Sequence, residues 1–263
     1  MKKKILKIGI WSVTIILFIV LVVFVTKKYN LSNCHQVIIS INAPTDCTFI
    51  SEAEVRTFIR KAGDSLVNIP LSQINVQNLE SKVNENPFVL SSKVYTTIDG
   101  TLKIDIVQRT PIARVQNLYD QCFYITDDGR MMPLIKGKTA RVLFANGYIP
   151  EMYWNSASLA VDTTHKSADS NSYKTLKAIY QISKYINTDA FWKAQIQQLF
   201  VNTNGDIELI PAVGNQIIIF GDEKNIADKF EKLKIFYKKA EKINAWTKYD
   251  TININFKGQV VCS

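Results

Sequence analysis

The sequence predicts an α+β protein with a single N-terminal transmembrane helix, a small domain of element order β-α-α-β-β, and a larger mixed β domain with flanking helices. Three features predict this class. An uncharged apolar run fills residues 8–25, short strand and helix patterns alternate over residues 37–109, and strand patterns with two longer helices fill residues 110–263. A chain of 263 residues has room for about two domains.

The apolar run IGIWSVTIILFIVLVVFV, Ile8–Val25, is long enough to cross a bilayer as a helix. A cleaved signal peptide is the alternative, but signal peptides have a shorter apolar core and end at a small-residue site, whereas this run ends at Thr26 and two lysines. We therefore expect a retained anchor.

Lysines on the two sides of the run set its orientation. Four precede it and two follow it, and they are Lys2, Lys3, Lys4, Lys7, Lys27 and Lys28. The positive-inside rule then places residues 1–7 in the cytoplasm and makes residues 26–36 a juxtamembrane linker. We expect a single-pass type II protein of the cell inner membrane, with most of its mass on the outer side of that membrane.

The net charge gives no sign of nucleic-acid binding. Of the formal net charge of +9, six charges come from the lysines beside the apolar run, so the rest of the chain carries about +3. Acidic and basic residues are interspersed there, as on an ordinary soluble surface. We expect no nucleic-acid partner.

The signatures of catalysis and metal binding are missing. The sequence has no G-x-S-x-G, H-E-x-x-H, P-loop or C-x-x-C motif, and its two histidines, His35 and His165, lie in linker-like stretches. Asp127-Asp128 lies in a turn, where aspartate accepts hydrogen bonds from local amides. We expect no enzyme, no cofactor, no metal and no small-molecule substrate.

The cysteines all lie on the exported side, where disulfides persist. Four cysteines allow three full pairings, and the sequence does not choose among them: Cys34, Cys47, Cys122 and Cys262.

The first exported domain begins with a strand over residues 37–42. Ser51 and Glu54 form a capping box that opens a helix ending at Gly63. The remaining elements are a helix over about residues 73–86 and two strands, residues 88–97 and 101–108, joined through Asp99-Gly100.

A seam follows in the stretch KIDIVQRTPIARV. Its first half alternates as a strand, and a new apolar run starts directly after Pro111, which has no N–H to donate to a sheet. Arg109 at this seam is expected to brace the two domains through a carboxylate or to bind a partner. The alternative is a solvated arginine at a strand end.

The order β-α-α-β-β directly after one anchor resembles a POTRA (polypeptide-transport-associated) domain. The sequence further resembles the FtsQ/DivIB family of bacterial cell-division proteins, in particular its Bacteroidetes branch. In that family a segment similar to NPFVLSSKVYTTIDGTLKIDIVQRTPIARV, Asn86–Val115, closes the POTRA domain and enters a β domain with almost no linker. The hairpin CFYITDDGRMMPL, residues 122–134, is similar to the family pattern YYID-x-G-x-xxPL.

The second domain continues with strand and helix patterns. Residues 141–147 predict a strand, residues 172–187 a helix, and Asn204-Gly205 a turn between two strands. Residues 216–220 predict another strand, and Asp222 is expected to cap a long helix. Residues 251–261, TININFKGQVV, predict the closing strand.

The closing strand is the predicted partner-binding site. A strand placed last in a sheet by chain order is often an edge, and an unpaired edge is a template for another chain. The resemblance implies that it docks FtsB-like and FtsL-like single-pass coiled-coil proteins. The predicted binding residues are Ile252, Asn253, Ile254, Asn255, Phe256, Lys257, Gln259 and Val260.

The family often has D-L-R-Y where this chain has Asn253-Ile254-Asn255-Phe256, so both charges are missing here. Backbone pairing and an aromatic anchor at Phe256 remain. The alternative is a plain closing strand with Phe256 in the core.

The resemblance implies a non-catalytic, membrane-anchored scaffold that gathers division proteins at the septum and so activates septal peptidoglycan synthesis. A POTRA-bearing component of a protein-translocation system is the main alternative. Such systems normally carry tandem POTRA domains or a β-barrel, which this sequence does not predict. A membrane-tethered hydrolase would need catalytic residues that the sequence does not show.

Overall fold

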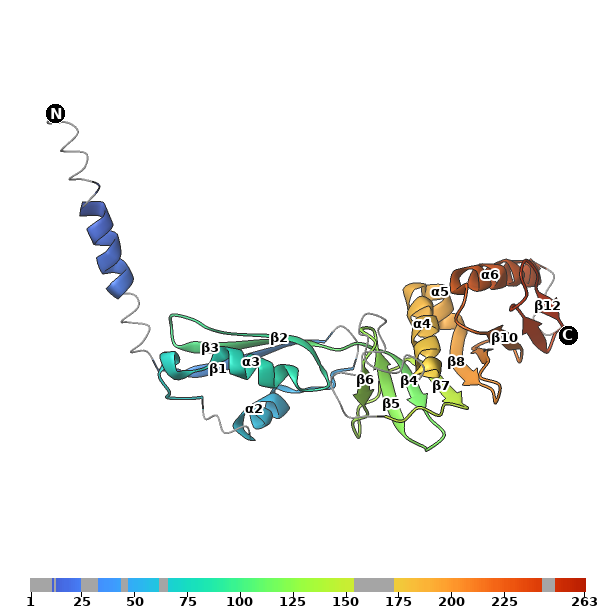
Figure 1. Ribbon diagram of the computed structural model, residues 1–263, viewed down its shortest axis with the longest axis horizontal. Helices are drawn as coiled ribbons and strands as arrows, with labels where there is room; N and C mark the ends of the chain where they lie inside the picture. Colours follow the sequence, from blue (N-terminus) through green and yellow to red (C-terminus); the bar gives the residue numbers. More distant parts are fainter. Residues whose placement is uncertain are drawn as a thin grey trace, which may run out of the picture. The chain divides into compact units, whose positions relative to one another are not determined.

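The computed structural model describes residues 11, 13–24, 33–43, 47–61, 66–153, 173–242 and 249–263. The chain forms two compact units (Figure 1). Unit 1 extends to Gln108 without residues 43–49, and unit 2 comprises Ala43–Phe49 and Arg109–Ser263. Helices and sheets occur in both units, so the predicted α+β class is confirmed.

Near the N-terminus, residues 13–24 are helical and their side chains are exposed. Within the described ranges, no helix is both long and apolar enough to cross a membrane. Part of the predicted span, including residues 8–10 and 25, lies outside those ranges, as do Gly63 and His165.

Unit 1 is built on a three-stranded sheet of order β1-β3-β2. β1 (Gln36–Asn42) runs parallel to β3 (Thr101–Gln108), and β2 (Val89–Thr96) runs antiparallel to β3. A parallel pair needs a crossover, because its strands run in the same direction and no tight turn can join them. The helical segment between β1 and β2 supplies part of that crossover.

In unit 1, each α-helix after β1 begins directly after a residue whose side chain caps it. α2 (Glu52–Lys61) opens on the predicted capping box: Ser51 N donates to Glu54 Oε2 at 2.6 Å, and Glu54 N donates to Ser51 Oγ at 3.3 Å. α3 (Val76–Asn84) starts later than predicted, because a 3-10 turn (Leu71–Gln73) comes first and Asn75 accepts from Asn78 N at 2.9 Å.

One face of the small sheet carries the hydrophobic core of unit 1. Buried positions recur at helical spacing in α2 and α3 and at every second position in β3, which are the periods of the two structures. The main members are Val55, Ile59, Leu79, Val83, Leu102, Ile104 and Ile106.

Unit 2 is built on a nine-stranded mixed sheet of order β12-β11-β10-β9-β8-β7-β4-β5-β6. The central pairs β4·β7 and β7·β8 are parallel and the outer pairs are mainly antiparallel. The strands are β4 (Pro111–Gln116), β5 (Cys122–Thr126), β6 (Met131–Pro133), β7 (Leu143–Gly147), β8 (Ile196–Val201), β9 (Ile207–Pro211), β10 (Ile217–Gly221), β11 (Thr251–Asn253) and β12 (Val261–Cys262).

Three helices contribute to the core of unit 2: α4 (Lys174–Thr188), α5 (Ala190–Gln195) and α6 (Ile226–Lys242). The sequence did not predict α5, which is short and is capped by Asp189 accepting from Phe191 N at 2.9 Å. The expectation that Asp222 caps α6 is wrong. Asp222 accepts from Lys224 N and pairs with Lys229, whereas α6 begins at Ile226.

Candidate partner-binding site

The segment 251–263 differs from the single closing strand that the sequence predicts. β11 covers only three residues, β12 covers two, and residues 254–260 connect them. The side chain of Asn253 accepts from Asn255 N at 3.0 Å, and Gly258 has a φ of 73°. Such a local side-chain acceptor and a left-handed residue are typical of a turn, which explains why the strand breaks here.

β12, and not β11, is the end strand of the sheet. β11 pairs with β10 on one side and with β12 on the other, while β12 has a partner only on its β11 side among the described strands. The expectation of an edge in the closing segment therefore applies to β12 alone. Alternation ends before Gly258, which is itself a sequence signal for a break, but the pattern alone does not show which of the two short strands lies at the end of the sheet.

The register of β11 and β12 shows which backbone groups point outward. Thr251 N donates to Ser263 O and Ser263 N donates to Thr251 O, both at 3.1 Å, so these two residues form a hydrogen-bonded pair. In an antiparallel ladder such pairs alternate with pairs whose amides point away from the neighbouring strand. Cys262, opposite Ile252, is the alternate position, so its N–H and C=O point away from β11. Cys262 is not among the binding residues that the sequence predicts, because only the strand register shows that its backbone groups point outward.

The predicted binding residues fall into two groups. Ile252 and Ile254 are fully buried in the core of unit 2, and Asn253 and Val260 are half-buried. The other four are exposed: Asn255, Phe256, Lys257 and Gln259. The alternative that places Phe256 in the core is wrong, because 48% of this residue is exposed.

Gly221 and Asn255 are in close contact beside this turn. Gly221 has a φ of +79°, and a Cβ built there would lie 2.7 Å from the side-chain atoms of Asn255. Glycine is therefore required both by the backbone conformation and by the neighbouring side chain.

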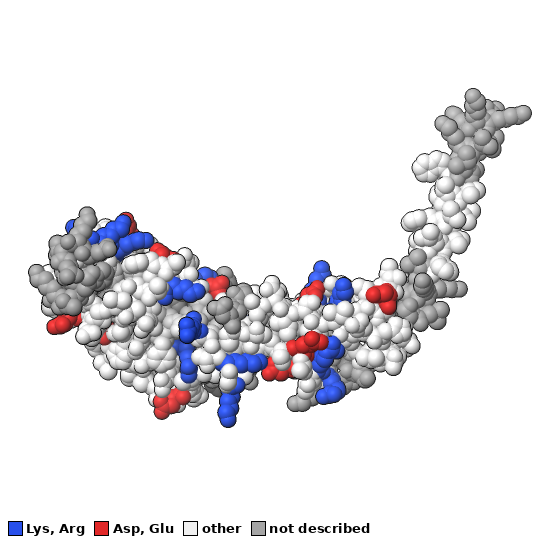
Figure 2. All heavy atoms as spheres, turned by 180° about the vertical axis from the view of Figure 1, so that it is seen from behind, with Lys and Arg blue, Asp and Glu red and all other residues white. Residues whose placement is uncertain are grey.

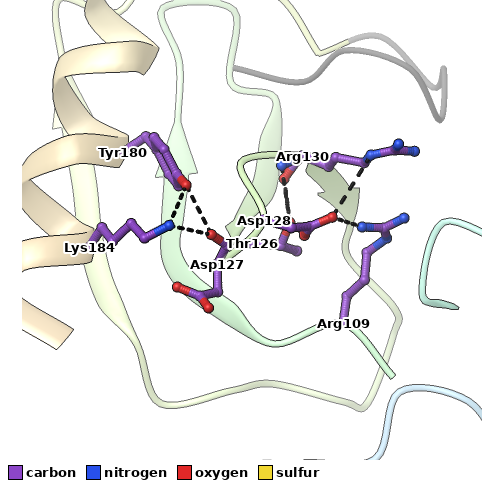
Figure 3. A network of polar contacts seen from close by, with 7 residues as sticks. All are labelled: Arg109, Thr126, Asp127, Asp128, Arg130, Tyr180 and Lys184. Atoms are coloured by element: carbon purple, nitrogen blue, oxygen red, sulfur yellow. Dashed lines mark hydrogen bonds and ion pairs between the residues drawn. The ribbon is translucent and has the colours of Figure 1, made fainter. Parts of the chain in front are cut away.

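Arg109 and Pro111 lie beside β4, toward the opposite end of the same sheet. Figure 3 shows Arg109 with the residues of the turn that it contacts. Pro111 is the first residue of β4, a place where a missing N–H is tolerated. Only 6% of the Arg109 side chain is exposed, so the alternative of a solvated arginine is wrong. Its guanidinium pairs with Asp128, in the turn between β5 and β6, and both residues belong to unit 2.

Two arginines, Arg109 and Arg130, lie near the single carboxylate of Asp128. Thr126 Oγ1 donates to Asp128 Oδ1 at 2.6 Å, and Arg130 Nε lies 3.8 Å from Asp128 Oδ2. Burial, and to a lesser degree the positive charge of Arg130, lower the pKa of Arg109 to about 10. Arg109 therefore stays positively charged at neutral pH.

Helix α4 fixes the other side of the same turn. Tyr180 OH donates to Asp127 O at 2.9 Å, and Lys184 Nζ lies 2.9 Å from Tyr180 OH and 3.4 Å from Asp127 O. Figure 3 shows these contacts beside those of Asp128. Asp127 and Asp128 thus take part in the anchoring of a turn, which is held from one side by Arg109 and from the other by Tyr180.

The surface charges are mixed. On the face shown in Figure 2, acidic and basic side chains are scattered between larger uncharged areas. In the part of the chain that the structure describes, no three His, Cys, Asp or Glu side chains are grouped in a way that could hold a metal ion.

Two family models match the chain. The model described as "FtsQ/DivIB, C-terminal related" matches residues 110–263, more than half of the chain, and a POTRA-like domain model matches residues 32–107. A search of curated proteins found no match. The two matched regions meet at residues 108–109, the point at which the chain passes from unit 1 to unit 2.

Proposed function

We propose that this chain, which belongs to the FtsQ/DivIB C-terminal-related family, is a non-catalytic scaffold of the bacterial division site. The POTRA-like domain that it also carries supports the same role. The scaffold gathers divisome proteins at the septum, and this gathering activates septal peptidoglycan synthesis. The role requires binding surfaces and no reacting groups.

The observation that carries the proposal is the outer edge of β12. The outward N–H and C=O of Cys262 can add one strand of a partner to the sheet. Val261 and Phe256, which are 45% and 48% exposed, are the large apolar side chains of this segment that a partner would cover. Side-chain ion pairs cannot carry the docking at Asn253 and Asn255, since amides stand where the family often has charges.

The proposed partners are FtsB-like and FtsL-like single-pass coiled-coil proteins. Backbone pairing suits this assignment because amides and carbonyls are present whatever the side chains are. The docking surface comprises the β12 edge and the exposed turn residues from Asn255 to Gln259.

Membrane anchoring belongs to the same proposal. The apolar run Ile8–Val25 and its flanking lysines support an N-terminus inside the cell and both units outside. Alkaline phosphatase fused after Ser263 should then be active. A mature N-terminus beyond Thr26 would contradict a retained anchor.

Location and depletion test the proposed role in cells. A fluorescent fusion should form a band at mid-cell, and depletion should give filamentous cells with segregated chromosomes. Normal division after complete depletion would contradict the role. Even distribution around the membrane, with defects in protein export, would instead indicate a translocation component.

A further inference from the structure

Lys232 of α6 contacts the start of the turn between β11 and β12. Its Nζ donates to Ile254 O at 2.7 Å and to Phe256 O at 2.6 Å. Hydrogen bonds from an ammonium to carbonyl oxygens are charge-assisted, and they are shorter and stronger than bonds between neutral groups. One side chain therefore holds two carbonyls of a segment that has just left the sheet.

The helix that carries Lys232 is itself firmly placed. Phe230, Leu233 and Tyr237 of α6 are buried in the core of unit 2, and the Phe230 and Phe220 ring centroids are 5.2 Å apart. The side chain of Lys232 thus joins a helix that is held in the core to a turn whose residues 255–259 are exposed.

The turn begins where the ladder to β10 ends. Ile254 N donates to Ile219 O at 3.1 Å, which is the last ladder bond that the segment makes to β10. Beyond it the residues from Asn255 to Gln259 are exposed, so burial does little to fix the position of Phe256. The two bonds from Lys232 lie directly before and after Asn255, where the chain starts to turn.

We infer that Lys232 is a positioning residue of the docking surface: its ammonium holds the turn so that Phe256 and the β12 edge are presented together. The inference rests on the proposed function. It adds that the affinity for the partner depends on a lysine of α6 that need not touch the partner.

Hydrogen exchange tests the link without any partner. In Lys232→Met the ammonium is lost while most of the apolar stem is kept. The hydrogen-bonded amides on the two sides of the turn, Ile254 N and Ser263 N, should then exchange about tenfold faster or more, given the strength of bonds to charged groups. Lys232→Arg keeps a cationic donor and should restore much of the protection. Lys239→Met, at an exposed position about two turns further along α6, is the matched control and should change nothing in this segment.

Partner binding is measured next, with the extracytoplasmic segment of the FtsB-like protein of the same organism as the probe. Lys232→Met should bind it about tenfold more weakly, Lys232→Arg should recover most of the affinity, and Lys239→Met should bind like the wild type. The midpoint of thermal unfolding of each variant should show that the protein is folded at the temperature of the binding measurement. The weaker binding of Lys232→Met then does not come from unfolded protein.

The outcomes distinguish the proposed docking of the partner from the positioning role of Lys232. If the wild type does not bind the probe, the proposed docking fails, whereas faster exchange in Lys232→Met would still support the link. If the wild type binds and Lys232→Met binds equally well, the positioning role is overturned. Should Lys232→Met not fold, reductive methylation of the wild type decides: Lys232 should be modified more slowly than Lys239, and equal rates would overturn the inference.

Discussion

The two ends of the nine-stranded sheet are each fixed by one cation, but the two cations bind different groups. At the β6 end, Arg109 is buried and pairs with the carboxylate of Asp128. At the β12 end, Lys232 is half-buried and binds two neutral carbonyls. A buried ion pair is costly to break because the remaining charge loses its partner, whereas a lysine released from carbonyls can turn toward water.

The two edge strands, β6 and β12, also differ in their ability to pair with another strand. β6 ends in Pro133, which has no N–H with which to pair another strand, while β12 contains no proline. The β6 edge is therefore the less able of the two to add a strand, and under the proposed function recruitment takes place at the β12 edge. Changes at the first should lower stability and leave partner binding intact, and changes at the second should do the reverse.

The largest expected effect is on stability at the β6 end. Asp128→Ala leaves the Arg109 charge buried without its carboxylate and should lower the free energy of unfolding by about 3 kcal/mol. Chemical denaturation measures this, and the affinity of the folded protein for its partner should not change.

The double variant Arg109→Met with Asp128→Ala is the control. Removing both charges should recover much of the lost stability, because no buried charge is then left without its partner. If the double variant is less stable than Asp128→Ala alone, the ion pair is not the cause of the loss.

The next effect in size is on binding at the β12 end. Phe256→Ala should weaken partner binding by about 2 kcal/mol, or roughly thirtyfold, if the exposed ring is the aromatic anchor of the interface. Stability should change by no more than about 0.5 kcal/mol, because about half of this residue is exposed to solvent. Titration calorimetry and thermal unfolding separate the two quantities, and a stability loss without a binding loss would contradict the assignment.

An effect of similar size, but on stability, is expected at Gly221. Alanine there meets both a left-handed backbone and the side chain of Asn255, so Gly221→Ala should cost about 1–3 kcal/mol and displace the docking turn. Gly205→Ala is a matched control, because Gly205 has a φ of +86° and open space around the position of a Cβ. Equal stability losses in the two variants would mean that the contact with Asn255 has no energetic weight.

The smallest effect concerns acid stability near α5. The hydrogen bond from Phe191 N, followed by the one from Lys234, lowers the pKa of Asp189 below its usual value. A carboxylate with a lowered pKa stabilises the fold above its unfolded-state pKa, and this contribution is lost as the pH falls through the lower, folded-state pKa. Asp189→Ala should therefore lower the midpoint of thermal unfolding at pH 7, with a difference that shrinks in strong acid. A difference that persists unchanged in strong acid would contradict an electrostatic cause.

The sequence predicted most of the elements because their signals are local. The capping box at Ser51, the Asp99-Gly100 turn and the alternation of β3 each depend on residues close together in the chain, and the structure has all three. The helix start at Asn75 was misplaced because a 3-10 turn directly before it continues the same apolar pattern.

The candidate site was less accessible from the sequence, since it depends on register. The outward amide of Cys262 follows from the pairing of Thr251 with Ser263, and the contact between Lys232 and Phe256 joins residues 24 positions apart. Alternation within one segment carries information on neither. The partner of Arg109 was likewise open until the turn at Asp128 was placed.

The most direct test of recruitment through the β12 edge compares two variants of one residue. Cys262→Pro removes the outward N–H but none of the bonds between Thr251 and Ser263, whereas Cys262→Ala removes only the thiol and keeps the amide. Affinity for the extracytoplasmic segment of the FtsB-like protein should fall by about tenfold or more in Cys262→Pro and stay near the wild-type value in Cys262→Ala, with both proteins folded. Wild-type affinity in Cys262→Pro would contradict recognition through the backbone of β12.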